Sequence, residues 1–265
     1  MTSIHIQSKS LPSTVPVART DASRRALLVC GVGSSLLYAA MLVFIPMLWD
    51  GYSSAEQAVS ELSAIDTPTR TVWVPLGIVY TVLVTAFGFG VWGAARGNRA
   101  LRVVGGLLVA YGVIGLGWPP MHQREVLAAG GGTLTDTLHI VWTIVTVLLM
   151  LLAIGFSVAA FGGRFRWYSI ASLVILLVFG SLPWMYATGI EANTPTPWIG
   201  VWQRICIATY LLWVVVLALV LLRRRAPVRL TTAAMDTRRS TQFSWREMLI
   251  IRRQRRVIAQ NQRTS

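Results

Sequence analysis

Six long apolar segments set the fold class of this chain. They cover about 26–49, 71–94, 101–119, 136–161, 167–188 and 199–222. As helices, segments of this length cross a hydrocarbon core of about 30 Å. Charged residues make up only 13% of the chain, against about 25% in soluble domains. We therefore predict an all-α, polytopic membrane bundle of six transmembrane helices.

The positions of the basic residues predict how this bundle is oriented. Of the 24 lysines and arginines, 21 fall in the two tails and in the second and fourth loops. Only Arg70, Arg124 and Arg204 fall on the other side, together with seven of the ten acidic residues. Because basic residues stay cytoplasmic, we expect both termini in the cytoplasm and a location in the cytoplasmic membrane of a bacterial cell. Membrane orientation accounts for the net charge of +14, so no nucleic-acid partner is expected.

The charge pattern also divides the chain into three parts. Residues 1–24 are predicted to be a disordered, basic cytoplasmic tail, residues 25–223 the membrane domain, and residues 224–265 a second basic tail. In the second tail, Ser244 and Glu247 form a capping-box pattern before an apolar run with several arginines. This pattern fits a helix bound to anionic lipid headgroups, and a solvated tail is the alternative.

Two local patterns predict structure inside the membrane domain. Ser53 and Glu56 form a capping-box pattern, and apolar residues then recur at helical spacing. We expect a short amphipathic helix there, lying on the outer surface of the bundle and ending before Pro68. Small residues allow helices in lipid to approach closely, so we expect helix contacts at Ala86, Gly90, Ala94, Gly105, Gly106, Gly112, Gly115 and Gly117.

Polar residues near the predicted outer side are the candidates for chemistry. Asp136 and His139 share one helix face at i and i+3, and a carboxylate can orient an imidazole as a base. They are the candidate catalytic pair, with Arg204 as an anion clamp. Further candidate substrate or anion ligands are Ser60, Glu61, His122, Arg124 and Gln203. The alternative, which we favour, is that Asp136, Arg204 and Glu61 neutralise one another and fix helix ends.

The sequence offers little support for a metal or a cofactor. There are three histidines, and one of them, His5, lies in the N-terminal tail. The chain has neither a phosphate-binding glycine loop nor a redox-active cysteine pair. We therefore expect no bound metal and no cofactor.

The order of several short motifs resembles a known family. The motifs are Ser60-Glu61-Leu62, Trp118-Pro119, His139, and Gly200 followed by Gln203-Arg204. Over residues 26–222 the chain resembles domain-of-unknown-function family 998, six-span membrane proteins of bacteria and archaea. It departs from that family's pattern in having Pro120 and Met121 where an acidic residue usually follows the proline, and Gln203 where a Glu is frequent. The resemblance implies the architecture and carries no settled activity.

Three functions remain open at this point. The first is a multi-pass membrane protein that binds lipid, is not an enzyme and can form a homo-oligomer. The second is a membrane-embedded hydrolase or lipid-modifying enzyme that uses Asp136 and His139 with Arg204. The third, a small-solute transporter, is weaker because no predicted span carries a charge at its centre.

Overall fold

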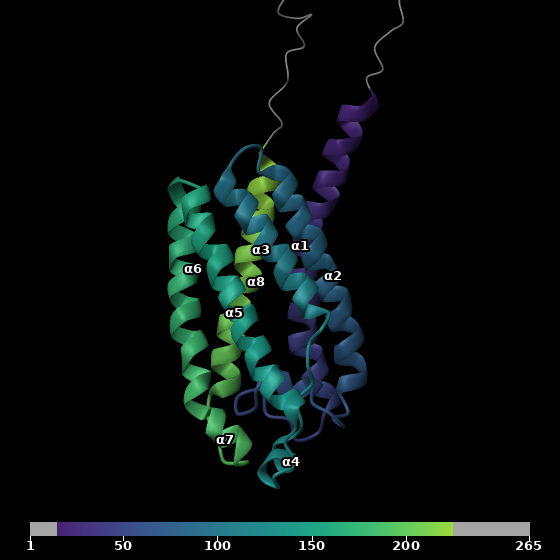
Figure 1. The fold of residues 1–265 in the computed structure, drawn as a ribbon, viewed down its shortest axis with the longest axis vertical. Helices are drawn as coiled ribbons and strands as arrows, with labels where there is room; N and C mark the ends of the chain where they lie inside the picture. Colours follow the sequence, from purple (N-terminus) through teal and green to yellow (C-terminus); the bar gives the residue numbers. More distant parts are fainter. Residues whose placement is uncertain (1–14, 225–265) are drawn as a thin grey trace, which may run out of the picture. The chain divides into compact units, whose positions relative to one another are not determined.

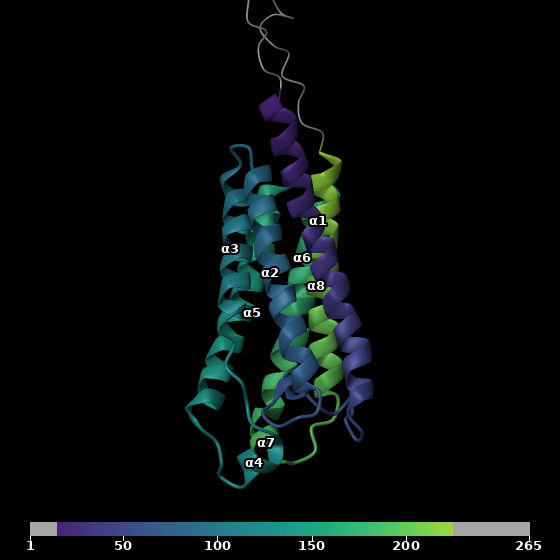
Figure 2. The ribbon, with the colours of Figure 1, turned by 90° about the vertical axis from the view of Figure 1, so that its right-hand side faces the viewer.

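Long antiparallel helices form the part of the chain that the computed structural model describes, residues 15–224 (Figures 1 and 2). The predicted surface helix after Ser244 lies outside this range, as do residues 1–14. The long helices are α1 (Val15–Phe44), α2 (Arg70–Ala94), α3 (Arg99–Gly115), α5 (Leu134–Ala160), α6 (Gly163–Ser181) and α8 (Ile199–Arg223). The connections hold short 3-10 helices, η1 (Ile45–Leu48), η2 (Val59–Ser63) and η3 (Leu182–Tyr186), and short α-helices, α4 (Arg124–Ala128) and α7 (Ala187–Glu191).

The two ends of the bundle differ in chemistry. We call the connecting segments 45–69, 116–133 and 182–198 together the cap; they lie at one end of the bundle, with α4 and α7 (Figure 1). We call the opposite end, where α1 begins and α8 ends, the arginine end. Within residues 15–224 its arginines are Arg19, Arg24, Arg25, Arg96, Arg99, Arg102, Arg164, Arg166, Arg223 and Arg224.

In the described part of the chain, five helical segments are long and apolar enough to cross a membrane: Asp21–Leu48, Arg70–Ala94, Leu134–Ala160, Gly163–Glu191 and Ile199–Arg223. This confirms the predicted all-α polytopic bundle. Helix α3 has 17 residues and is shorter than predicted, because it ends before the two prolines that cannot continue a helix. It packs between α2 and α5, and the count of six spans stays a prediction.

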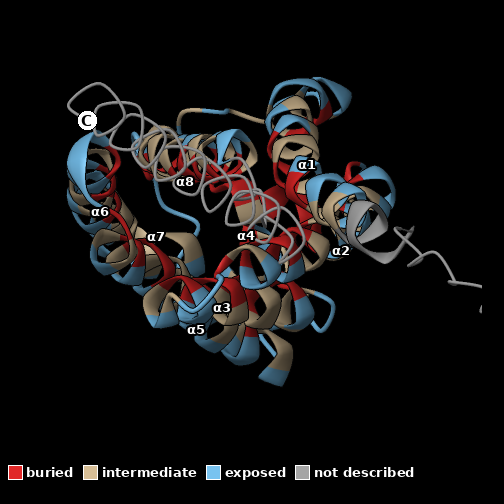
Figure 3. Cartoon of the chain, turned by 90° about the horizontal axis from the view of Figure 1, so that it is seen from above, coloured by how far each residue is buried: buried red, intermediate tan, exposed pale blue. Residues whose placement is uncertain are grey.

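Large apolar side chains cover the outside of the bundle. Leu36 on α1 is 66% exposed, Leu134 on α5 72% and Trp167 on α6 71%. Buried residues lie on the inward sides of the helices (Figure 3). Exposed apolar surface of this extent is expected where lipid replaces water as the solvent.

Helix α1 begins earlier than the sequence predicted. Residues 15–24, expected to belong to a disordered tail, are helical. The Arg24 guanidinium lies 3.0 Å from the Asp21 carboxylate, an i,i+3 ion pair of the kind that supports an exposed helix end.

Glycines allow α2 and α3 to pack with their backbones in contact. A Cβ atom added at Gly105 would lie 2.6 Å from the Trp92 backbone nitrogen, and one at Gly88 would lie 2.7 Å from the Val109 nitrogen. At Gly112 a Cβ would lie 2.9 Å from the Thr81 carbonyl oxygen. The predicted contacts at Gly105 and Gly112 are confirmed.

The first connection of the cap differs from the predicted amphipathic helix. Its helical part is the five-residue η2, and Val59, Glu61 and Leu62 of η2 are buried. Ser53 does cap locally, since its hydroxyl accepts from the Glu56 backbone nitrogen at 3.3 Å. The segment does not continue as an α-helix because side chains from α4 and α8 take up its carbonyl and amide groups, as described next.

Candidate functional site

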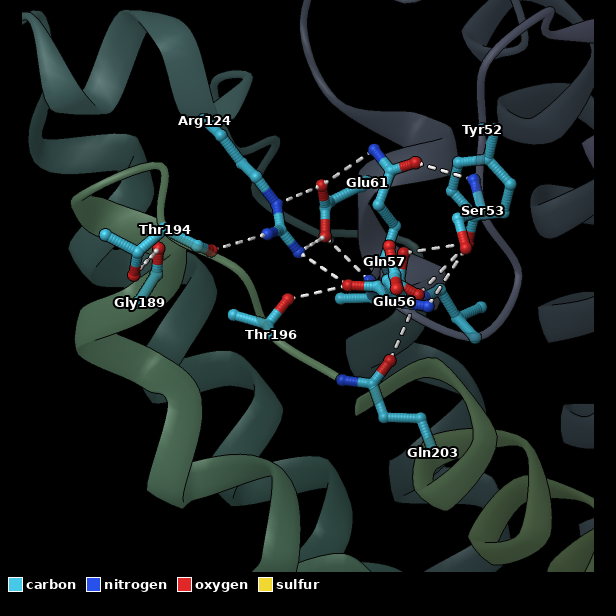
Figure 4. A network of polar contacts seen from close by, with 12 residues as sticks. Tyr52, Ser53, Glu56, Gln57, Glu61, Arg124, Gly189, Thr194, Thr196 and Gln203 are labelled. Atoms are coloured by element: carbon cyan, nitrogen blue, oxygen red, sulfur yellow. Dashed lines mark hydrogen bonds and ion pairs between the residues drawn. The ribbon is translucent and has the colours of Figure 1, made fainter. Parts of the chain in front are cut away.

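A buried ion pair between Glu61 and Arg124 lies at the centre of the cap (Figure 4). Arg124 Nε donates to Glu61 Oε2 and its terminal nitrogen donates to Oε1, each at 2.7 Å. Glu61 Oε1 also accepts from the Ala58 backbone nitrogen at 2.6 Å, and Oε2 from Gln57 Nε2 at 3.3 Å. The carboxylate therefore accepts four hydrogen bonds, which suits a structural charge better than an acid or base.

Arg124 also joins three connections of the cap. Its terminal nitrogens donate to the Glu56 carbonyl at 3.2 Å and to the Thr194 carbonyl at 3.5 Å. The Thr196 hydroxyl donates to the same Glu56 carbonyl at 2.6 Å. The side chains and carbonyls of Figure 4 therefore hold the first, third and fifth connections together.

The first turns of α8 hold the first connection from the other side. The Gly200 backbone nitrogen donates to the Ala55 carbonyl at 3.0 Å, and Gln203 Oε1 accepts from the Val59 nitrogen at 2.7 Å. A side chain at Gly200 would collide with the carbonyl oxygens of Ser54 and Gln57. This close approach explains why the first turn of α8 has a glycine at position 200.

Arg204 is held by neutral groups alone. One terminal nitrogen donates to the Ser54 carbonyl at 2.7 Å and the Gly200 carbonyl at 3.1 Å, and the other to the Tyr52 hydroxyl at 3.1 Å. Within residues 15–224 its guanidinium forms no ion pair with a carboxylate. The expected neutralisation of Arg204 by Asp136 or Glu61 is therefore wrong. Burial raises the pKa of Tyr52, an effect that the hydrogen bond from Arg204 opposes.

Asp136 forms its close contacts with His122. Asp136 Oδ1 accepts from the His122 backbone nitrogen at 2.7 Å, and Oδ2 lies 2.9 Å from His122 Nδ1. Oδ2 also accepts from the Thr133 nitrogen at 2.8 Å, which caps the first turn of α5. Because the Asp136 carboxylate caps the first turn of α5, it points toward the connection that precedes this helix, where His122 lies.

His139 is bonded to a backbone carbonyl. Its Nδ1 lies 2.8 Å from the Pro119 oxygen, and its ring packs edge-on against Trp118 with centroids 5.6 Å apart. In the described chain no hydrogen bond joins His139 to Asp136. The predicted pairing of these two side chains is therefore replaced by a pairing of Asp136 with His122.

The other candidates contribute to the cap in smaller ways. Ser60 offers its carbonyl, which accepts from the Ser63 hydroxyl at 2.7 Å. Sequence reasoning missed Arg70, which donates to the Ser63 carbonyl at 2.6 Å and lies over the Trp118 ring at 5.8 Å. The sequence did hold one indication of Arg70: it is one of three basic residues on the side of the membrane domain where most acidic residues lie.

The space beside the ion pair is small. A cavity of about 20 Å³ is lined by Trp49, Gln57, Glu61, Ala64, Gln123, Arg124 and Glu125. This volume holds about one water molecule, so a lipid headgroup does not fit there. Within residues 15–224, no three His, Cys, Asp or Glu side chains come together as metal ligands.

Comparison with known proteins identifies the family of the chain but assigns it no activity. No curated protein and no solved structure matches the chain. Residues 32–220 match a family model described as "Protein of unknown function (DUF998)". This match covers well over half of the chain, and it includes every helix of the cap and all the cap residues described above. The chain therefore belongs to the DUF998 family.

Proposed function

We propose that this membrane protein binds anionic lipid headgroups at its capped end, with Arg204 as the main cation. The observation that carries the proposal is the guanidinium of Arg204, which forms no ion pair within the described residues. A charge near the membrane boundary is stabilised by a partner of opposite sign. A lipid phosphate supplies one, and guanidinium groups bind phosphate with paired hydrogen bonds.

The surroundings of Arg204 support a headgroup as the partner. Arg204 lies in the second turn of α8, beside Trp202 and near Trp198 in the sequence. Trp202 packs against Tyr186 with centroids 5.5 Å apart, and Trp49 packs against Tyr52 at 5.4 Å. Tryptophan and tyrosine gather at headgroup level in membrane proteins, which supports a lipid phosphate as the partner of this arginine.

Among the described residues Arg204 Nε forms no hydrogen bond, so this donor can still bind an anion. Its contact with the Ser54 hydroxyl is long, 3.4 Å, and on the exposed side of the cap. The shorter bonds to carbonyl oxygens fix the guanidinium plane without neutralising it. A fixed, unneutralised guanidinium binds an anion at little entropic cost.

The test is a measurement of thermal stability in detergent with added phosphatidylglycerol or phosphatidylcholine. A ligand at 100 times its Kd stabilises the folded state by about 2.7 kcal/mol, so phosphatidylglycerol should raise the Tm by several degrees. Arg204→Gln should abolish most of this rise. Arg99→Gln, at the arginine end, should retain it and is the matched control. If Arg204→Gln retains the full rise with phosphatidylglycerol, the proposal fails.

A further inference from the structure

The contact between His122 and Asp136 has the geometry of an oriented base. A carboxylate oxygen can only accept, so His122 Nδ1, 2.9 Å from Asp136 Oδ2, carries the proton. In the neutral form of the ring, Nε2 is therefore the unprotonated nitrogen. The second bond, from the His122 backbone nitrogen to Asp136 Oδ1 at 2.7 Å, holds the residue to the same carboxylate. Both the tautomer and the position of the ring are thereby set.

The second nitrogen of this ring is not fully buried. In residues 15–224, two fully buried side-chain nitrogen or oxygen atoms lack a partner, Arg24 Nε and Tyr210 Oη. His122 Nε2 forms no hydrogen bond among the described residues and is not one of these two atoms, so it is not fully buried. The His122 side chain is 19% exposed. His139, in contrast, is bonded to a neutral carbonyl and has no carboxylate to orient it.

From this geometry we propose that His122 is a catalytic base that hydrolyses a carboxylic ester of a membrane lipid, with Asp136 as its positioning residue. His122 lies in the connection between α3 and α4, in the cap. The ester linkages of lipids lie close to the headgroups, at the ends of spanning helices. This activity goes beyond headgroup binding and does not depend on Arg204.

The reaction balances with water as the only co-substrate. His122 Nε2 takes a proton from water as the water oxygen bonds to the ester carbonyl carbon, and the carbonyl oxygen becomes an oxyanion. The tetrahedral intermediate collapses, the bond from carbon to the alcohol oxygen breaks, and Nε2 returns the proton to the departing alkoxide. The products are a fatty acid and an alcohol, and the Asp136 carboxylate stabilises the imidazolium between the two steps.

One imidazole favours a carboxylic ester over a phosphodiester. In attack on a carbonyl, the group that removes the proton from water lies on the same side as the leaving oxygen and can return it. In-line displacement at phosphorus places the nucleophile and the leaving group on opposite sides, so it needs a second acid. His122 is the imidazole that a carboxylate orients in the described chain.

The test is release of labelled fatty acid from phosphatidylglycerol in mixed micelles by the full-length protein. His122→Asn places an amide nitrogen near the position of Nδ1, so the bond to Asp136 is retained while the base is removed. We expect a loss of about a hundredfold or more in rate, with an unchanged Tm. His139→Asn, which preserves the bond to the Pro119 carbonyl in the same way, should hydrolyse at the wild-type rate.

The variant Asp136→Asn tests whether Asp136 positions the His122 ring or only supports the fold. It should lower kcat with little change in the apparent KM, since the substrate does not contact Asp136. A wild-type protein that releases no fatty acid overturns the proposal, as does a His122→Asn variant of wild-type activity. Either result leaves the headgroup proposal standing if phosphatidylglycerol still raises the Tm through Arg204, so the two failures are distinguishable.

Discussion

Two arginines at the same end of the bundle have opposite electrostatic surroundings. Arg124 is 7% exposed and its charge is matched by a carboxylate with two short hydrogen bonds. Arg204 is half-buried, and within the described residues it is bonded to carbonyl and hydroxyl oxygens alone. A matched, buried pair fixes structure, whereas an unmatched and accessible cation is available to a ligand. The charge balance therefore assigns Arg124 to the structure of the cap and leaves Arg204 as the candidate for binding an anion.

The buried pair gives the first prediction. Glu61→Gln leaves the Arg124 guanidinium in a buried site without a countercharge, which costs about 3–5 kcal/mol when one partner of a buried pair is removed. The unfolding free energy in detergent, measured by titration with denaturing surfactant, should fall by that amount. Glu125→Gln, at the exposed neighbour of Arg124, is the control and should leave stability unchanged. Equal stability of Glu61→Gln and wild type would show that the pair is not desolvated.

At the scale of the element, the apolar segments and the glycines were predictable because their causes are local. The third span ended early for a reason visible in the sequence, the prolines after Trp118. The conformation of the first connection, in contrast, depends on residues far away in the sequence. Ser53 and Glu56 form the start of a capping box, but the following backbone bonds to Gln203 and Arg204, about 150 positions away. Single-segment patterns cannot predict that competition.

The candidate site follows the same rule. Its residues were found from their charge and their depth, and the contacts between them were not. Asp136 and His139 are neighbours on a helix surface by spacing, but the first turn of α5 has unpaired backbone groups, and the carboxylate turns to cap them. His122 then approaches from the preceding connection, whose path depends on the fold of the whole cap.

Close packing of α2 on α3 gives the second prediction. Gly105→Ala places a Cβ 2.6 Å from the Trp92 backbone nitrogen, and the helices must separate to accept it. Overpacking of this kind costs about 1–3 kcal/mol. Gly93→Ala is a matched control on α2, since nothing lies within 4 Å of its added Cβ, and better helix propensity should make it neutral or slightly stabilising. Surfactant-induced unfolding of the two variants measures the difference.

For the whole molecule, the distribution of charge between the two ends predicts its orientation in a membrane. Within residues 15–224, ten arginines lie at the end where α1 begins and α8 ends. The capped end carries three arginines, Arg70, Arg124 and Arg204, among seven acidic residues. An uncompensated basic end stays cytoplasmic, which would place the cap, and both proposed activities, on the outer side.

Cysteine labelling tests this orientation and, with it, whether α3 crosses the membrane. Arg99 and Glu125 are exposed and flank α3, one at the arginine end and one in the cap. In a chain with Cys30 and Cys206 replaced by alanine, a membrane-impermeant maleimide applied to intact cells should label Glu125→Cys and not Arg99→Cys. After permeabilisation both should react. Labelling of Arg99→Cys alone would mean that the cap faces inward, and equal labelling of both in intact cells would mean that α3 does not cross.

Helix α3 is about 25 Å long at 1.5 Å per residue, slightly under the hydrocarbon thickness. If it crosses, the bilayer thins around it or the prolines after it lie below the headgroups, at the depth of His139.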